Sequence, residues 1–145
     1  MRIRINRLAS DAVLPRKGSK DAAGSDLCAL LEEPCVIGPG ETKLIHTGLA
    51  MEIPQGYAGF VYARSGLASK EGLAPANKVG VIDSDYRGEV MVSLHNHSSL
   101  PRTVMPGQRI AQIVIAAVED AEFIDSEELT DTDRGEGGFG STGKN

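Results

Sequence analysis

The sequence predicts an all-β protein: a jelly-roll-like β-barrel or sandwich with one short helix and a mobile glycine-rich C-terminal arm. Seventeen glycines and seven prolines in 145 residues favour short strands joined by many turns. Apolar residues alternate or cluster in short runs, with turn residues every 8–12 positions or so. The hydrophobic fraction of 41% is sufficient for one domain with its own core.

The strands are expected where apolar and polar residues alternate or where a short run is apolar throughout. Residues 2–7 and 89–96 alternate strictly, and the nearly continuous apolar run 110–118 is typical of a strand covered on both faces. One short helix is expected at 67–71, where Ser65 is a suitable N-cap. Further strands are expected at 44–47, 49–53 and 57–62.

Charge divides the chain into two parts. The first twenty residues carry six Lys or Arg and one Asp, whereas residues 119–136 carry nine Asp or Glu and one Arg. We therefore expect a β-barrel catalytic domain at 1–118, followed at 119–145 by an acidic linker and an arm that has little to pack against.

Net charge and cysteine content restrict the possible partners and the compartment. A net charge of −5 argues against a nucleic-acid polymer as partner, yet it allows a small anionic ligand that needs only a few local cations. The two cysteines have neither metal-site nor redox spacing, and no segment has the length and hydropathy of a membrane span. The expected protein is soluble, intracellular and cytoplasmic.

A first candidate site is the segment 63–68, which contains Arg64, Ser65 and Gly66. The start of a helix offers unpaired N–H groups to an anion, and the Arg64 guanidinium can hold two phosphate oxygens at once. Taken alone, however, the segment is more simply read as a capping serine beside a surface arginine.

A second candidate is Asp83, which follows the aliphatic pair Val81 and Ile82. Residues 77–96 read as a β-hairpin, and a carboxylate at its turn can be partly shielded from water. Such a carboxylate could position a nucleophilic water. The alternative is that Asp83 and Asp85 are ordinary turn formers, and their positions in the sequence do not decide between the two.

The third candidate is the glycine-rich stretch 134–143 near the end of the chain. Residues 135–140 match GxGxxG and residues 138–144 match most of a P-loop, but neither motif is followed by the helix that it requires. The glycines still allow backbone N–H groups to surround an anion, and Phe139 can stack on a flat base. A flexible tail is the alternative.

Four other side chains are weaker candidates. His95 and His97 could bind a metal, but a satisfied surface pair is several times more common because no third ligand is evident. Asp26 could hold a hydrated cation or cap a turn. Gln112 is a lone amide in an apolar run, so it should have a specific partner, either backbone or ligand.

Five segments, taken in order, resemble the five-motif pattern of the homotrimeric deoxyuridine triphosphatase (dUTPase) family. The resemblance covers essentially the whole chain. The segments are Ala23-Gly24-Ser25-Asp26-Leu27, Ala63-Arg64-Ser65-Gly66-Leu67-Ala68, Asn77 with residues 80–88 (Gly-Val-Ile-Asp-Ser-Asp-Tyr-Arg-Gly), residues 107–112 (Gly-Gln-Arg-Ile-Ala-Gln), and residues 134–143 (Arg-Gly-Glu-Gly-Gly-Phe-Gly-Ser-Thr-Gly).

The resemblance implies a trimer that uses Mg²⁺ to hydrolyse dUTP to dUMP and pyrophosphate. This activity limits uracil incorporation into DNA and supplies dUMP for thymidylate synthesis. Each active site is then built by three subunits, with the arm closing over a site formed by its neighbours. By matching position, Asp83 orients the water that attacks the α-phosphorus, and Asp26 contacts the metal through water.

The resemblance also implies the remaining contacts. Arg64, Ser65, Gly66 and Gln112 hold the phosphates. Asn77 and the backbone at Val81 and Ile82 read the uracil edge, with Met91 lining the pocket. Tyr86 packs under the deoxyribose and leaves no room for a 2′-hydroxyl. In the arm, Phe139 stacks on the base, and Arg134, Gly140 and Ser141 close on the terminal phosphates.

Two rival functions are compatible with the same fold. A dCTP deaminase resembles the family in fold and in the Arg-Ser segment, but it requires a different pocket carboxylate and lacks the arm. A non-catalytic nucleotide-binding trimer is the second rival. The intact Asp83 and the complete arm count against it.

Overall fold

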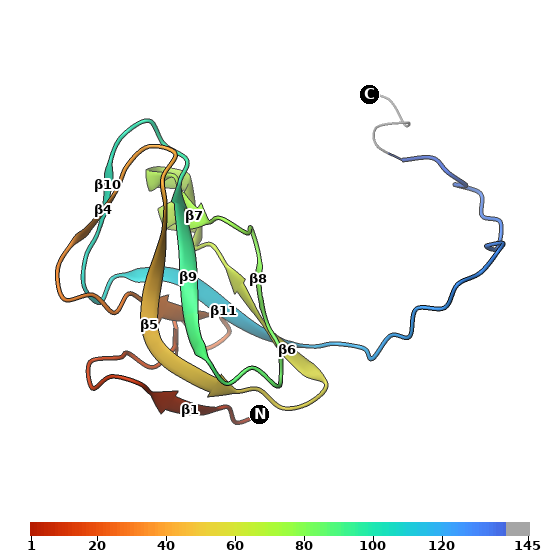
Figure 1. The fold of residues 1–145 in the computed structure, drawn as a ribbon, viewed down its shortest axis with the longest axis horizontal. Helices are drawn as coiled ribbons and strands as arrows, with labels where there is room; N and C mark the ends of the chain where they lie inside the picture. The colour runs from red at the N-terminus through yellow and green to blue at the C-terminus, as the bar shows by residue number, and fades with distance from the viewer. Residues whose placement is uncertain (139–145) are drawn as a thin grey trace.

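The computed structural model describes residues 1–138 and consists of antiparallel strands in three sheets (Figure 1). The four-stranded sheet has the order β1 (Arg4–Arg7), β5 (Thr42–Glu52), β9 (Glu89–Asn96), β7 (Leu73–Pro75). The five-stranded sheet has the order β2 (Arg16–Lys17), β3 (Ser25–Cys28), β11 (Arg109–Ala117), β6 (Tyr57–Tyr62), β8 (Gly80–Ile82). The remaining pair is β4 (Cys35–Ile37) with β10 (Arg102–Val104). The all-β prediction is confirmed.

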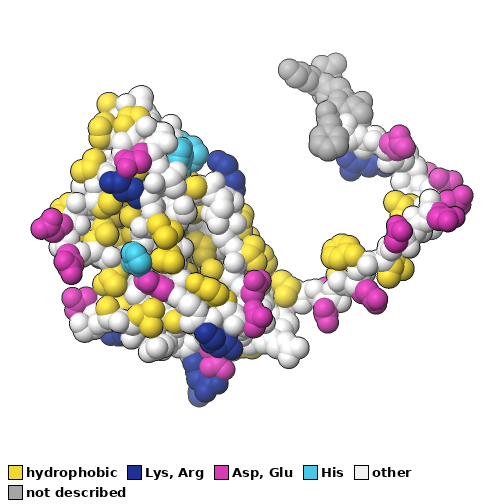
Figure 2. Space-filling model, viewed as in Figure 1, with side chains coloured by type: hydrophobic (Ala, Val, Ile, Leu, Met, Phe, Trp, Pro, Cys, Tyr) yellow, Lys and Arg dark blue, Asp and Glu magenta, His cyan; other side chains and the backbone are white. Residues whose placement is uncertain are grey.

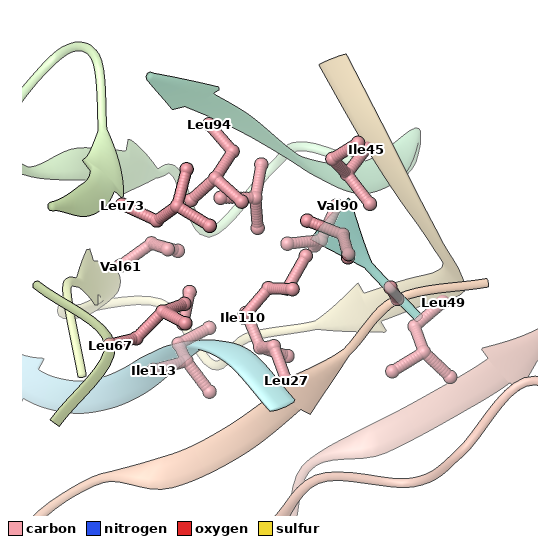
Figure 3. Packing of buried hydrophobic residues seen from close by; sticks show 14 of the residues in the cluster. Leu27, Ile45, Leu49, Val61, Leu67, Leu73, Val90, Leu94, Ile110 and Ile113 are labelled. Atoms are coloured by element: carbon pink, nitrogen blue, oxygen red, sulfur yellow. The ribbon is translucent and has the colours of Figure 1, made fainter. Parts of the chain in front are cut away.

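The core is formed where the two large sheets face each other. Strand β9 alternates between partly buried and fully buried residues along its whole length, as its sequence pattern predicts. Figure 3 shows side chains of both sheets in one cluster, with Val90 and Leu94 of β9 near Leu27, Val61 and Ile110 of the other sheet. Burying these aliphatic side chains stabilises the fold by roughly 1.5–3 kcal/mol for each residue.

The two strands expected at 44–47 and 49–53 form one strand, β5, with a bulge at Gly48. Gly48 has φ = 68°, and the pairing with β9 shifts register between His46 and Ala50. A Cβ at residue 48 would lie 2.7 Å from Leu30 and 2.9 Å from Ala12. A glycine is therefore required both by the backbone conformation and by the close packing.

The β-hairpin expected over residues 77–96 does not form. Strand β8 pairs with β6, whereas β9 pairs with β5 and β7. The loop 83–88 therefore crosses from one sheet to the other. The hairpin prediction was wrong, because alternation along a strand shows which face is buried but does not identify the strand that pairs with it.

Two further expectations need correction. In β11, Ile110 and Ala111 are fully buried on opposite faces, but residues 114–116 are only partly buried, so both faces are covered only near the start of the strand. The short helix is present as η1 (Leu67–Glu71), a single π-helical turn. Its N-cap is Gly66, which makes no side-chain capping bond, so Ser65 does not cap the helix.

After β11, residues 119–138 form neither helix nor strand and extend away from the sheets (Figure 1). Acidic side chains lie along this stretch (Figure 2). Phe123 is 95% exposed, so this part of the chain buries little of its own apolar surface. Within residues 1–138, no helix has the length and hydropathy needed to span a bilayer.

Candidate functional site

A pocket of about 300 Å³ lies between strands β8 and β9. It exists because the two strands belong to different sheets and diverge from the loop 83–88 that joins them. Strand β8 is the last strand of its sheet, so within residues 1–138 no strand pairs with one edge of its backbone, and this edge can bond to a ligand. Six of the residues expected to bind substrate line this pocket: Asn77, Val81, Ile82, Asp83, Tyr86 and Met91.

Asp83 follows β8 directly and lies at the start of the loop 83–88. Its carbonyl oxygen accepts a hydrogen bond of 3.2 Å from the Tyr86 N–H, which closes a turn. The residue is exposed, so the expectation of a partly shielded carboxylate is wrong for the single chain. The carboxylate is thus accessible to water at the rim of the pocket.

The other side of the loop is fixed by Tyr86 and Arg87. The Tyr86 hydroxyl donates to the backbone oxygen of Glu89 over 3.0 Å. Arg87 donates to the backbone oxygens of Ser84 (2.7 Å) and Tyr86 (3.0 Å). These bonds hold the loop in a defined shape, although five of its six residues, Asp83 included, are exposed on the surface.

A second, smaller pocket of about 220 Å³ contains the residues expected to bind phosphate and metal. Asp26 of β3 accepts a 2.7 Å bond from Arg64 Nε and a 3.1 Å bond from Arg109 Nη1. Two guanidinium groups thus face one carboxylate, which leaves a local positive charge for an anion. The pocket is lined by Gly18, Ala22, Gly24, Asp26, Arg64, Ser65, Gly66, Arg109 and Gln112.

Gln112 has a backbone partner within the chain. Its amide nitrogen donates to the Ala63 oxygen over 2.9 Å, which ties β11 to the segment that carries Arg64. A Cβ at residue 24 would lie 2.4 Å from Gln112 Oε1. Gly24 therefore makes room for the Gln112 amide, and this close approach is a steric reason for a glycine at this position of the segment 23–27.

The two pockets share no lining residue. The expected site residues thus fall into two groups that a single chain keeps apart. Arg134 lies in neither group: it is exposed on the extended segment, where its Nε donates to the Gly137 oxygen over 2.7 Å. Phe139, Gly140 and Ser141 lie outside the described residues.

Sequence reasoning assigned no role to two charged residues at the pockets. Arg109 lies beside the expected phosphate ligands, and its place in the segment 107–112 was the available signal. Glu89 lines the first pocket and accepts bonds from His46 Nδ1 (2.8 Å) and from the Gly48 N–H (2.7 Å). Partial burial opposes ionisation of Glu89, but these bonds outweigh it, so the pKa of Glu89 is lower than usual.

The described residues contain no cluster of three or more His, Cys, Asp or Glu side chains that could hold a metal. The rings of His95 and His97 lie edge to face with centroids 4.4 Å apart, and His95 Nδ1 is hydrogen-bonded to Thr42 Oγ1 over 2.7 Å. This agrees with a satisfied surface pair. A metal here would need ligands from outside the described part of the chain.

Comparison with known proteins identifies the family to which this geometry belongs. The family model described as dUTPase matches residues 10–143. The chain belongs to the dUTPase family. A deoxyuridine 5′-triphosphate nucleotidohydrolase of Nautilia profundicola is 52% identical over 144 residues, which cover 99% of this chain and 100% of the relative. One of Desulfitobacterium hafniense is 54% identical over 131 residues, covering 90% of this chain and 87% of the relative.

Solved dUTPase structures have the same fold. A mutant dUTPase of Staphylococcus bacteriophage 80alpha with dUpNHpp has a TM-score of 0.85 and 28% identity, and the match covers 99% of each chain. A mutant dUTPase from phage phi11 of S. aureus, described as revealing the coordination of a structural Mg(II) ion, has a TM-score of 0.77 and 26% identity. That match covers 89% of this chain and 99% of the phage chain.

Proposed function

We propose that this dUTPase family member hydrolyses dUTP to dUMP and pyrophosphate by attack of water on the α-phosphorus. The observation that carries the proposal is the exposed carboxylate of Asp83 at the rim of a pocket formed beside the free edge of β8. The membership in the family and the roughly half-identical relatives over nearly the full chain support it.

The base is proposed to enter the pocket between β8 and β9. The backbone of Val81 and Ile82 can pair with the polar edge of uracil, as an added strand would, while Asn77 offers an amide. Met91 narrows the apolar wall. A cytosine would reverse donors and acceptors and leave these groups unpaired, and a thymine methyl would overlap with the wall.

The phosphates are proposed to bind at the second pocket. Arg64 uses Nε to contact Asp26, so its terminal nitrogens can bond to phosphate oxygens. Ser65 and Gly66 are the two helical residues directly before η1, and backbone N–H groups at such a helix start have no helical partner. Gln112 completes this set, and phosphoryl transfer requires mainly such positioning and neutralisation of charge.

The site fits a magnesium ion that is held mainly by the triphosphate. Mg²⁺ usually keeps several waters and binds through one or two carboxylates together with substrate phosphates, so it needs no cage of protein ligands. Asp26 is a carboxylate beside the proposed phosphate site, and a contact through water is compatible with its two arginine partners. The ion would neutralise charge on the phosphates.

We further propose that the two pockets meet only between subunits of a homotrimer. In one chain they are separate, Arg134 lines neither, and residues 119–138 extend away from the sheets (Figure 1). The glycine-rich arm would then close over a site formed by its neighbours. In that closed state Phe139 would stack on the base, while Arg134, Gly140 and Ser141 would bond to the terminal phosphates.

The test is pyrophosphate release from dUTP, dTTP, dCTP and UTP under identical conditions with Mg²⁺. We expect release from dUTP at a kcat/KM at least about 100-fold above that for the other three. Ammonia from dCTP without pyrophosphate from dUTP would instead indicate a deaminase. Binding of dUTP without turnover would indicate a non-catalytic nucleotide-binding protein, and either result contradicts the proposal.

A further inference from the structure

We propose that Gly88 is a specificity-determining residue: the missing side chain at this position allows Tyr86 to occupy the place from which it excludes ribonucleotides. This inference rests on the proposed function, because it concerns the choice between dUTP and UTP at the same site. Gly88 does not line the pocket, so its effect acts through Tyr86 alone.

Tyr86 folds back over the residue two positions further along the chain. A Cβ at residue 88 would lie 2.4 Å from the Tyr86 hydroxyl oxygen, 2.6 Å from Cζ and 2.9 Å from Cε2. Ordinary van der Waals contacts begin at 3.4 Å, so the hydroxyl end of the ring would have to move by about 1 Å to admit a methyl group.

The backbone at Gly88 does not itself require glycine. Its φ is not positive, unlike that of Gly48 or Gly72. An alanine at residue 88 therefore encounters no left-handed strain, and the three atoms nearest to its Cβ all belong to Tyr86. The requirement for glycine is thus a requirement on the position of one side chain.

The ring is held on its other side by a hydrogen bond to β9. The Tyr86 hydroxyl donates to the backbone oxygen of Glu89, and the Glu89 carboxylate is in turn bonded to the Gly48 N–H and His46. Because Glu89 is fixed to β5, it gives the hydroxyl a rigid acceptor. An open space at Gly88 and a fixed acceptor at Glu89 together determine where the ring lies.

Displacing this ring should change selectivity more than it changes the fold. Tyr86 is 40% exposed, so moving it exposes little core surface. In the proposed complex, however, the ring lies under the sugar, and a shift of 1 Å there would make room for a 2′-hydroxyl. Misplacement by this amount can change a rate by about 100-fold.

The experiment is a double-mutant cycle read out as the ratio of kcat/KM for dUTP to that for UTP. Gly88→Ala should lower this ratio by about tenfold or more. In a Tyr86→Ala background, Gly88→Ala should cause no further change, because the group it displaces is absent. Gly38→Ala is the matched control: its Cβ would meet only Glu41, at 3.4 Å, and it should leave the ratio unchanged.

Tyr86→Phe provides an independent measurement that keeps the ring and the glycine but removes the bond to Glu89. It should lower the ratio by less than Gly88→Ala does, because the glycine still leaves the ring its space. If Gly88→Ala alone fails to fold, the double variant Tyr86→Ala/Gly88→Ala should fold, because the obstructing ring is absent, and a double variant that also fails to fold overturns the inference. An unchanged ratio in Gly88→Ala, or an equal fall in the Tyr86→Ala background, overturns the inference while wild-type dUTP hydrolysis still supports the proposed function. A wild-type chain that does not hydrolyse dUTP overturns both.

Discussion

At the residue scale, Asp83 offers the sharpest test of the proposed chemistry. Asp83→Asn keeps the shape of the side chain but removes the charge that would orient and polarise a water. We expect kcat for dUTP to fall by about 100-fold or more while KM changes only a few-fold, because base and phosphates are held by other residues. Steady-state pyrophosphate release measures both constants.

Asp85 provides the matched control for this substitution. It lies in the same exposed loop, two residues further along, but does not line the pocket. Asp85→Asn should therefore keep the wild-type rate. An Asp83→Asn enzyme as fast as the wild type, or an equal loss in both variants, contradicts the role assigned to Asp83.

Which residues line the two pockets could largely be predicted from the sequence, because the segments that contain them form an ordered pattern. Their environments could not. Asp83 is exposed in the chain, and Ser65 makes no cap, since both properties depend on neighbours that the local sequence does not specify. Arg109 was overlooked because its contact with Asp26 joins two strands 83 residues apart in the sequence.

At the scale of elements, the connection between β5 and β9 depends on the carboxylate of Glu89. Burial raises the pKa of Glu89, but the bonds from His46 and the Gly48 N–H lower it by more than burial raises it. The folded state therefore binds the proton less readily than the unfolded state. The stability that Glu89 contributes is therefore present above the ordinary pKa of a glutamate and is lost as the pH falls through the lowered value.

The corresponding prediction concerns Glu89→Gln. The unfolding free energy of the wild type should exceed that of the variant at pH 7, and the difference should shrink as the pH falls toward 3. Urea titrations at several pH values measure it. Glu33→Gln, at an exposed position, is the control and should show no such pH-dependent difference. A constant difference for Glu89→Gln across this range contradicts the assignment.

Strand β9 has the expected bounds, because a period of two over eight residues is unambiguous. Strand β6 also has its expected bounds, although its burial does not alternate. The strictly alternating stretch 2–7, in contrast, forms the shorter strand β1 (Arg4–Arg7). Their partners could not be predicted in the same way. The break expected at Gly48 is a bulge inside β5, and the expected hairpin is a crossing between two sheets. Both depend on pairing between distant segments.

At the scale of the whole molecule, the separation of the two pockets has a consequence that activity can reveal. Asp83 and Arg64 line different pockets of one chain, and the proposed trimer brings them together from different subunits. Asp83→Asn and Arg64→Ala should each inactivate a trimer made of one kind of chain. In a mixed trimer, however, an intact Asp83 of one variant can meet an intact Arg64 of the other.

The prediction is that the two inactive variants complement each other. The two variants are unfolded and refolded together in equal amounts. By chance, about a quarter of the sites should then combine an intact Asp83 from one subunit with an intact Arg64 from another, so about a quarter of wild-type turnover should return. Mixing the folded variants without unfolding is the control, and it should restore little while the trimers remain assembled. If each site were contained in one chain, joint refolding would restore no activity, because every chain carries a defect in its own site.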